Sequence, residues 1–263
     1  MRIASLQPSV TLTLAALGRL DLLCAHTKYC LEALPSLAGL NLPIVSDSWT
    51  TNSEELHAID PSLVIASVPY RIESFVKILK AGFPLLALAP NSLEDVADDM
   101  RLIARQVDRL SEAELLIEEF QRALAARRDA TRNLERVTVY CEEWGKPPIH
   151  SQRWIAELID ANGGTFVGKP GDQTTPEAIA DTDPDVLIFA WCGAGNRVPL
   201  RRVIAQRNWS HLRAVRSRRV YCIPDEYLNT PAISSLAQGL AHIATAIHPE
   251  RSTGGQLITL PTE

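Results

Sequence analysis

Several features that mark common protein classes are absent from this sequence. No apolar run approaches the roughly 20 residues that a membrane-spanning helix needs, so we expect no insertion into a membrane. The formal net charge is -5, which gives no electrostatic reason to expect nucleic acid or an anionic membrane surface as a partner. The first residues carry no apolar segment with a small-residue cleavage site. This predicts a cytoplasmic protein as the sequence stands, and a periplasmic one if a leader has been removed.

Cysteine and histidine are few and scattered. The cysteines are odd in number and show no C-x-x-C spacing, so we expect buried free thiols rather than a disulfide framework or a zinc site. The histidines include no pair spaced by four residues, and we expect no metal site. The five cysteines are Cys24, Cys30, Cys141, Cys192 and Cys222.

Catalytic motifs are absent as well. The sequence contains no G-x-S-x-G, no G-x-x-x-x-G-K-[ST] and no H-E-x-x-H motif. The loop with Gly193 and Gly195 lacks the third glycine and the helix entry of a dinucleotide-binding fingerprint. We therefore predict no catalytic residue and no catalytic cofactor, and we do not expect an enzyme.

Short apolar runs alternate with amphipathic stretches along the chain, which is typical of parallel α/β proteins. Helices are predicted over residues 72–81, ended by Gly82, and over residues 93–107, capped by Ser92 with Asp95 behind it. The predicted strands are residues 2–6, 22–26, 63–66, 85–89, 137–140, 186–190 and 220–223.

One predicted helix, over residues 111–133, is longer than a crossover within one sheet requires. Ser111 and Glu114 form an S-x-x-E pattern that predicts a capping box at its start. An ordinary surface helix is one interpretation, but we favour a rigid connector between two lobes. The predicted domains are an N-terminal α/β lobe (1–107), a connecting helix (108–134) and a C-terminal α/β lobe (135–263).

The two halves resemble each other at one place. Residues 52–65 align without gaps to residues 175–188, and both contain a glutamate, an Asp-Pro pair and an apolar run at matching positions. Each copy is predicted to form a capped short helix, an Asp-Pro turn and a buried strand. Two lobes of similar fold are the simplest explanation.

Large aromatic residues follow the predicted strands. Ligands of open α/β sheets bind beyond the carboxyl ends of the strands, and tryptophan and tyrosine offer a flat apolar face with one polar group. We therefore predict a site for a large, flat ligand with polar substituents. The six aromatic residues at strand ends are Tyr29, Trp49, Tyr70, Trp144, Trp191 and Tyr227.

Glu54 and Glu177 fall in the first turns of the two repeated helices. A carboxylate there stabilises the helix dipole by about 0.3–1 kcal/mol, which is a purely structural interpretation. The functional interpretation is one exposed acidic group per lobe that docks onto a partner presenting arginines. Spacing alone favours neither.

Together these features resemble the Fe/cobalamin-type, or class III, substrate-binding proteins of ABC importers, and specifically a cobalamin-binding member without a signal peptide. The resemblance covers about residues 2–250. The motifs that carry it are RIASLQPSVT (2–11), LG (17–18), YC (29–30), NSEEL (52–56), DPSLVI (60–65), RVTVYCEEW (136–144), ELIDANGG (157–164), TPE (175–177), DPDVLI (183–188) and RVY (219–221).

This resemblance implies two Rossmann-like lobes joined by a single long helix, with a ligand cleft between the lobes. It implies that cobalamin or a related corrinoid is held there by aromatic faces and by hydrogen bonds to its amides, without a protein ligand to cobalt. It also implies that Glu54 and Glu177 dock on an ABC permease, and we expect the protein to be a monomer. The implied ligand-binding residues are Tyr29, Trp49, Tyr70, Trp144, Trp191, Asp225, Tyr227 and Asn229.

Two alternatives stay open at this point. A haem or ferric-siderophore binder would use Tyr29 or His26 as an axial ligand, or the basic residues Arg71, Arg153 and Arg197. A corrinoid- or tetrapyrrole-modifying enzyme would use Glu142, Glu143 or Asp225 as acid/base groups, since adjacent carboxylates beside Trp144 favour raised pKa values.

Overall fold

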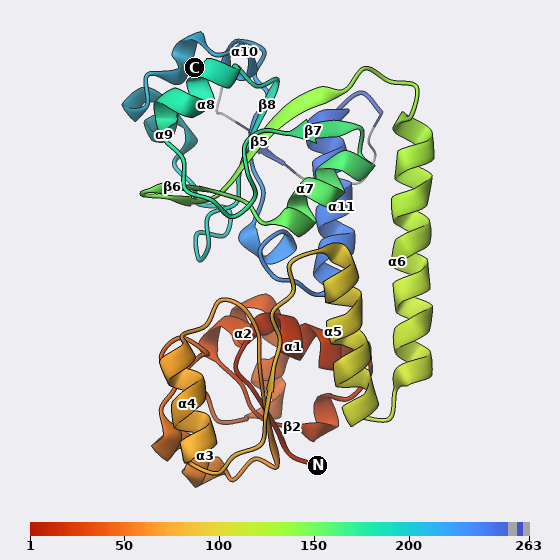
Figure 1. Cartoon of the computed structure of the whole chain (residues 1–263), viewed down its shortest axis with the longest axis vertical. Helices are drawn as coiled ribbons and strands as arrows, with labels where there is room; N and C mark the ends of the chain where they lie inside the picture. Colours follow the sequence, from red (N-terminus) through yellow and green to blue (C-terminus); the bar gives the residue numbers. More distant parts are fainter. Residues whose placement is uncertain (252–256, 260–263) are drawn as a thin grey trace. The chain divides into compact units, whose positions relative to one another are not determined.

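The computed structural model describes residues 1–251 and 257–259 of the chain (Figure 1). The chain divides into two compact units. Unit 1 comprises residues 1–117 and 231–234, and unit 2 comprises residues 118–230 and the described residues from 235 onward. Each unit contains a sheet of mainly parallel strands with helices in between, so the predicted two-domain α/β class is confirmed.

Unit 1 is built on a four-stranded sheet in the order β2-β1-β3-β4, and all its strand pairs are parallel. The central strand residues Val64, Ile65 and Ala66 are fully buried, as expected where helices cover both faces of a parallel sheet. The strands are β1 (Ile3–Ser5), β2 (Leu23–Ala25), β3 (Leu63–Ala66) and β4 (Leu85–Ala87). The α-helices are α1 (Pro8–Ala16), α2 (Lys28–Ala33), α3 (Ser53–Ile59), α4 (Ile72–Lys80) and α5 (Leu93–Gln106), with 3₁₀ turns η1 (Leu20–Leu22) and η2 (Pro35–Leu40).

Unit 2 is built on a sheet in the order β10-β9-β8-β5-β6, with β7 pairing β5. The pairs among β5, β7, β8 and β9 are parallel, whereas β6 and β10 are antiparallel to their neighbours. The strands are β5 (Val137–Gly145), β6 (Pro148–His150), β7 (Gly164–Phe166), β8 (Val186–Phe189), β9 (Val220–Cys222) and β10 (Ile258–Thr259). The helices are α7 (Arg153–Ala161), α8 (Pro176–Thr182), α9 (Leu200–Gln206), α10 (Arg213–Arg216) and α11 (Ile233–Ile247), with 3₁₀ turns η3 (Trp209–His211) and η4 (Asp225–Tyr227). The first two residues of α11 belong to unit 1.

Helix α6 (Leu110–Thr131) has 22 residues, of which the first belong to unit 1 and the rest to unit 2. The predicted capping box at its start is wrong, because the helix already begins at Leu110 and Ser111 lies inside it. Glu114 instead forms a bidentate ion pair with Arg101 of α5, whose Nε and Nη2 each lie 2.9 Å from a carboxylate oxygen. This pair holds the pKa of Glu114 below its usual range. Among the described helices, none combines the length and the apolar character that crossing a bilayer requires.

The predicted strands all occur, and the capping box of Ser92 and Asp95 on α5 is present. The short strands β6, β7 and β10 were not predicted, and β5 continues five residues beyond the predicted residue 140 to Gly145. β5 is longer because its second half pairs with β6 in a hairpin. Periodicity signals buried strands well but does not reveal a short edge hairpin of mixed polarity.

The predicted repeat is confirmed. In each copy a side chain caps a seven-residue helix, Asn52 on α3 and Thr175 on α8. Each helix ends at an aspartate in the left-handed region, Asp60 with φ 52° and Asp183 with φ 39°. The backbone carbonyl of each aspartate accepts a hydrogen bond from an arginine, at 3.4 Å from Arg2 and at 3.0 Å from Arg213.

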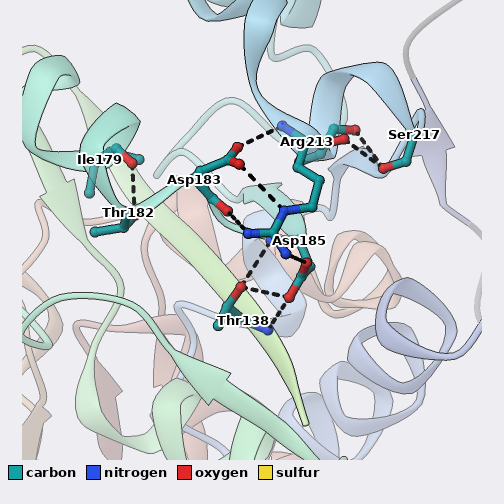
Figure 2. A network of polar contacts seen from close by, with 8 residues as sticks. Thr138, Ile179, Thr182, Asp183, Asp185, Arg213 and Ser217 are labelled. Atoms are coloured by element: carbon teal, nitrogen blue, oxygen red, sulfur yellow. Dashed lines mark hydrogen bonds and ion pairs between the residues drawn. The ribbon is translucent and has the colours of Figure 1, made fainter. Parts of the chain in front are cut away.

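A polar network fastens the amino ends of β5 and β8 in unit 2 (Figure 2). The carboxylate of Asp185 accepts hydrogen bonds from the backbone N–H and the hydroxyl of Thr138, at 2.8 and 2.7 Å, and from Arg213 at 2.8 Å. The backbone N–H of Arg213 donates to Asp183, which holds the pKa of Asp183 below its usual range. The network therefore ties α8, α10 and two neighbouring strands together.

We expect Asp185→Ala to lower the free energy of unfolding by about 1–3 kcal/mol, because it removes a charged acceptor from three donors. Urea unfolding followed by circular dichroism measures the change. The control is Asp181→Ala, which removes an exposed aspartate from the same region. Equal stability of the two variants would contradict the assigned role of Asp185.

Candidate functional site

Exposure separates the ten tryptophan and tyrosine residues into two sets. The six that were predicted at strand ends are all partly exposed: Trp49 is 48%, Trp144 46% and Tyr29 37% exposed, and the others are half-buried. The other four are Tyr140, Trp154, Trp209 and Tyr221, and all are buried in unit 2. Burial of all ten would leave no aromatic surface for a ligand, so the exposed six remain candidates for binding.

In unit 1, the carboxyl ends of the parallel strands β1, β2 and β3 lie at one edge of the sheet. Tyr29 is the second residue of α2, which follows β2, and Tyr70 lies in the loop that follows β3. Before Trp49, the chain forms an isolated parallel bridge between Ile44 and His26. We call Tyr29, Trp49 and Tyr70 the unit 1 aromatic group.

Polar contacts hold the loop of Trp49 against the start of α4. The Arg71 guanidinium lies over the Trp49 ring at 5.4 Å from its centroid, and the Ser74 hydroxyl donates to the Trp49 carbonyl at 3.1 Å. Tyr70 packs on Phe75 with ring centroids 4.4 Å apart. Trp49 therefore keeps a fixed backbone position while about half of its surface stays open to solvent.

In unit 2, Trp191 follows β8 and Tyr227 ends the turn η4 that follows β9. Trp144 differs from the prediction, because it lies inside β5 and pairs with Ile149 of β6 instead of following the strand in a loop. Its indole N–H donates to the Lys146 carbonyl at 3.0 Å. We call Trp144, Trp191 and Tyr227 the unit 2 aromatic group.

A buried polar cluster lies beneath Trp191. Glu142 is fully buried and accepts from the Trp191 indole N–H at 2.8 Å, from Arg207 at 2.7 and 2.9 Å, and from the Tyr140 hydroxyl. Burial and the neighbouring Glu142 carboxylate raise the pKa of Tyr140. Each carboxylate oxygen of Glu142 thus accepts from two internal donors.

Asp225 and Asn229 organise the loop that follows Trp191. The Asp225 carboxylate accepts from the backbone N–H groups of Gly193 and Gly195, both at 2.8 Å, and both glycines have positive φ. The Asn229 side-chain NH₂ donates to the Ala190 carbonyl at 2.5 Å and to Cys192 at 3.4 Å. Both side chains were predicted as ligand contacts. In the structure they hold in place the loop that contains Gly193 and Gly195, which we call the glycine loop.

Tyr227 is half-buried and stacks on His242 of α11, with ring centroids 4.7 Å apart and an interplanar angle of 16°. Close packing against α11 also places its backbone. A Cβ on Gly239 would lie 2.4 Å from the Tyr227 carbonyl oxygen, so only glycine lets the turn approach this helix. The ring is therefore positioned from two sides.

Glu54 and Glu177 are both exposed in the first turns of α3 and α8. The Glu54 backbone N–H donates to the Asn52 side chain at 3.0 Å, so the cap satisfies one of the free N–H groups at the start of α3. Both glutamates occupy equivalent positions in the repeat.

The residues proposed for a haem or siderophore site are buried or form contacts with other residues of the chain. His26 is 2% exposed and its Nδ1 lies 2.9 Å from the Thr27 carbonyl, so it offers no accessible axial nitrogen there. Arg153 pairs with Glu157 at 3.0 Å, and Arg197 contacts the Gly193 carbonyl. The described ranges contain no group of three His, Cys, Asp or Glu side chains arranged to hold a metal ion.

The cysteine prediction is correct for four residues and wrong for one. The thiols are free, and Cys24, Cys30, Cys141 and Cys222 are buried, but Cys192 is exposed. Cys192 is exposed because it lies in the glycine loop beyond the end of β8 rather than in a strand. The sequence gives no signal of this, since the loop begins only two residues after an apolar run.

Each of the two α/β units thus combines parallel strands with exposed aromatic side chains near their carboxyl ends. The family model described as periplasmic binding protein matches residues 3–227. The chain therefore belongs to the periplasmic binding protein family, as its sequence motifs predicted. Members of this family are substrate-binding proteins rather than enzymes; they bind small molecules, act outside the cytoplasm and interact with ABC permeases.

Individual relatives cover almost the whole chain. The chain is 24% identical over 251 residues to the vitamin B12-binding protein of Vibrio parahaemolyticus serotype O3:K6, covering 89% of this chain and 85% of the relative. A periplasmic heme-binding protein from Pseudomonas aeruginosa matches with a TM-score of 0.83 at 17% identity, covering 99% and 98% of the two chains. The periplasmic vitamin B12-binding protein of Vibrio cholerae matches with a TM-score of 0.75 at 22% identity, covering 96% and 98%. At these identities the solved structures show the fold alone.

Glu143, beside Trp144, is a carboxylic acid with a raised pKa. Burial raises the pKa of Glu143 to about 7 from an ordinary 4.5, while a hydrogen bond from Gln152 at 2.7 Å acts in the opposite direction. The folded state therefore holds a proton that the unfolded state releases. This contribution to stability is full below pH 4.5 and is lost as the pH rises to about 7.

We expect Glu143→Gln to remove part of the decline in unfolding free energy across this pH range. A residual decline should persist, because burial and the neighbouring Asp95 and Asp98 also raise the pKa of Asp99 to about 7. Urea unfolding at several pH values measures both slopes. Identical slopes for the variant and the unsubstituted protein would exclude a raised pKa at Glu143.

Proposed function

We propose that this chain is a solute-binding protein for cobalamin or a related corrinoid, held by the unit 1 and unit 2 aromatic groups together. The observation that carries the proposal is the division of the ten large aromatic residues, in which the exposed six are those beside the carboxyl ends of parallel strands. A corrinoid offers a broad apolar ring and many amides. Tryptophan and tyrosine match it with flat faces and single hydrogen-bonding groups.

The groups have fixed geometry, which favours binding of a rigid ligand. Trp191 is hydrogen-bonded through its indole nitrogen, Tyr227 is stacked on His242, and the Trp49 loop is anchored through Ser74. Side chains that are ordered before binding lose little conformational entropy when the ligand arrives. The similarity to vitamin B12-binding proteins in sequence and in fold supports the same ligand class.

Isothermal titration calorimetry with cyanocobalamin tests the proposal. We expect saturable one-to-one binding, and we expect Trp49→Ala to weaken it by about 1–3 kcal/mol because the ring contributes a broad apolar contact. The control is Trp154→Phe, which alters a buried tryptophan whose indole N–H donates to the Leu228 carbonyl. Heat no greater than that of dilution, with correctly folded protein, would rule out cobalamin as the ligand.

Haem is the second candidate. The observation that favours it is the exposed Tyr29 in the unit 1 aromatic group, because a tyrosinate is an established axial ligand of haem iron. If haem is the ligand, its addition should produce a Soret band that Tyr29→Phe shifts or removes. A Soret change that is the same in both proteins would mean that Tyr29 does not ligate the iron, and cobalamin binding with no haem binding would exclude this candidate.

We further propose that the protein delivers its ligand to an ABC permease through Glu54 and Glu177. Both carboxylates are exposed, and both stand at the same position of a repeated structural element, one in each unit. A carboxylate on a rigid helix start suits charge-assisted pairing with arginine. The equivalence of the two positions favours docking on a permease with two similar halves.

The double variant Glu54→Ala/Glu177→Ala should lower ligand uptake about tenfold or more in cells of the organism that produces this protein, because two charge-assisted contacts with the permease are lost. Its affinity for the ligand in calorimetry should stay unchanged. The control is Glu94→Ala, which removes an exposed glutamate from the first turn of α5 and hence a similar helix-dipole contribution. Equal uptake by all variants would leave the two glutamates as helix-dipole residues only.

A further inference from the structure

The buried cluster beneath Trp191 is more polar than its position in the core requires. The Glu142 side chain is 0% exposed and that of Arg207 is 8% exposed, and the two form a bidentate ion pair at 2.7 and 2.9 Å. Desolvation of two charges costs several kcal/mol per ion, and apolar residues of similar size are often equally or more stabilising. Fold stability alone does not account for the pair.

Every member of the cluster acts on the position of Trp191. Glu142 accepts a hydrogen bond from the indole N–H of Trp191 at 2.8 Å. The Arg207 guanidinium and the Tyr140 hydroxyl donate to the same carboxylate and hold it in place. Arg207 also donates to the Gly145 carbonyl at 3.2 Å, and its guanidinium lies over the Trp209 ring at 4.8 Å from the centroid. The acceptor for the indole is thus itself fixed by a charged group.

Gly145, at the end of β5, fixes the same indole from another side. A Cβ on Gly145 would lie 2.4 Å from Cζ2 and 2.8 Å from Cε2 and Cη2 of Trp191. These distances are shorter than any normal contact, so the ring occupies the space that a side chain would fill. The Phe189 ring also packs against Trp191, edge-on and at a centroid distance of 6.4 Å.

From these contacts we infer that Glu142, Arg207 and Gly145 are positioning residues that hold the Trp191 ring in one orientation for the ligand. This inference rests on the proposed function. It assigns the buried ion pair to ligand affinity through preorganisation of Trp191, rather than to catalysis or to stability of unit 2. A tryptophan that is already oriented gives up less rotamer entropy on binding.

The first experiment needs no ligand. In ¹⁵N-labelled protein, the Trp191 indole N–H is the cross-peak that disappears in Trp191→Phe. We expect it at low field with slow hydrogen exchange, because its acceptor is a buried carboxylate. Gly145→Ala should shift this cross-peak and accelerate its exchange, since the added methyl group displaces the ring. Gly39→Ala is the matched control, because a Cβ there meets no atom within 4 Å.

The second experiment measures affinity for cyanocobalamin in the same proteins. Gly145→Ala should weaken binding about tenfold or more, as expected for loss of one oriented aromatic contact, while Gly39→Ala binds like the unsubstituted protein. A triple variant, Tyr140→Phe with Glu142→Leu and Arg207→Met, replaces the cluster by apolar groups. It should unfold at the same or a higher temperature and still bind more weakly.

The outcomes distinguish this inference from the proposed function. Unchanged affinity in Gly145→Ala and in the folded triple variant, with tight binding by the unsubstituted protein, would overturn the positioning role alone. Absence of binding by the unsubstituted protein would overturn the proposed function together with the ligand role of the cluster. Loss of affinity that accompanies loss of thermal stability in the triple variant would show that the ion pair serves stability instead.

Discussion

Parallel pairing of strands determines where the loops of each unit lie. Because β1 and β3 in unit 1, and β5, β8 and β9 in unit 2, run in the same direction within each sheet, their carboxyl ends lie at one edge of that sheet. The loops that leave this edge carry Trp49, Tyr70, Trp191 and Tyr227. Residues that are distant in the sequence are therefore brought to one edge of each unit. The opposite, amino edge of unit 2 carries the Asp185 network, which serves the fold.

Much of the fold could be predicted from the sequence, because buried parallel strands appear as short apolar runs and helix caps have local signatures. The repeat of capped helix, Asp-Pro turn and strand was visible since its determinants lie within fourteen consecutive residues in each copy. Predictions failed where the decisive partner is distant. Glu114 matched a capping pattern, yet in the structure its carboxylate pairs with Arg101 of the preceding helix.

In the candidate site, too, features with a local sequence signal could be predicted and contacts between distant residues could not. Five of the six aromatic residues could be placed because strand ends are recognisable, whereas Trp144 lies inside β5. Exposure in the structure separates these six from the four buried ones. The pairing of Glu142 with Arg207 could not be found, because 65 residues separate the two and no local pattern joins them. Asp225 was predicted as a ligand contact, and its role in holding Gly193 and Gly195 depends on loop geometry that only the structure provides.

The proposed function requires that exposed aromatic side chains of both units bind a single large ligand. Hydroxyl-radical footprinting with mass spectrometry, with and without cyanocobalamin, examines this requirement because it reports each tryptophan separately. We expect the ligand to protect Trp49 in unit 1 and Trp191 in unit 2 together, while the buried Trp154 and Trp209 are unaffected. Protection of one unit alone, or of neither at saturating ligand, would contradict it.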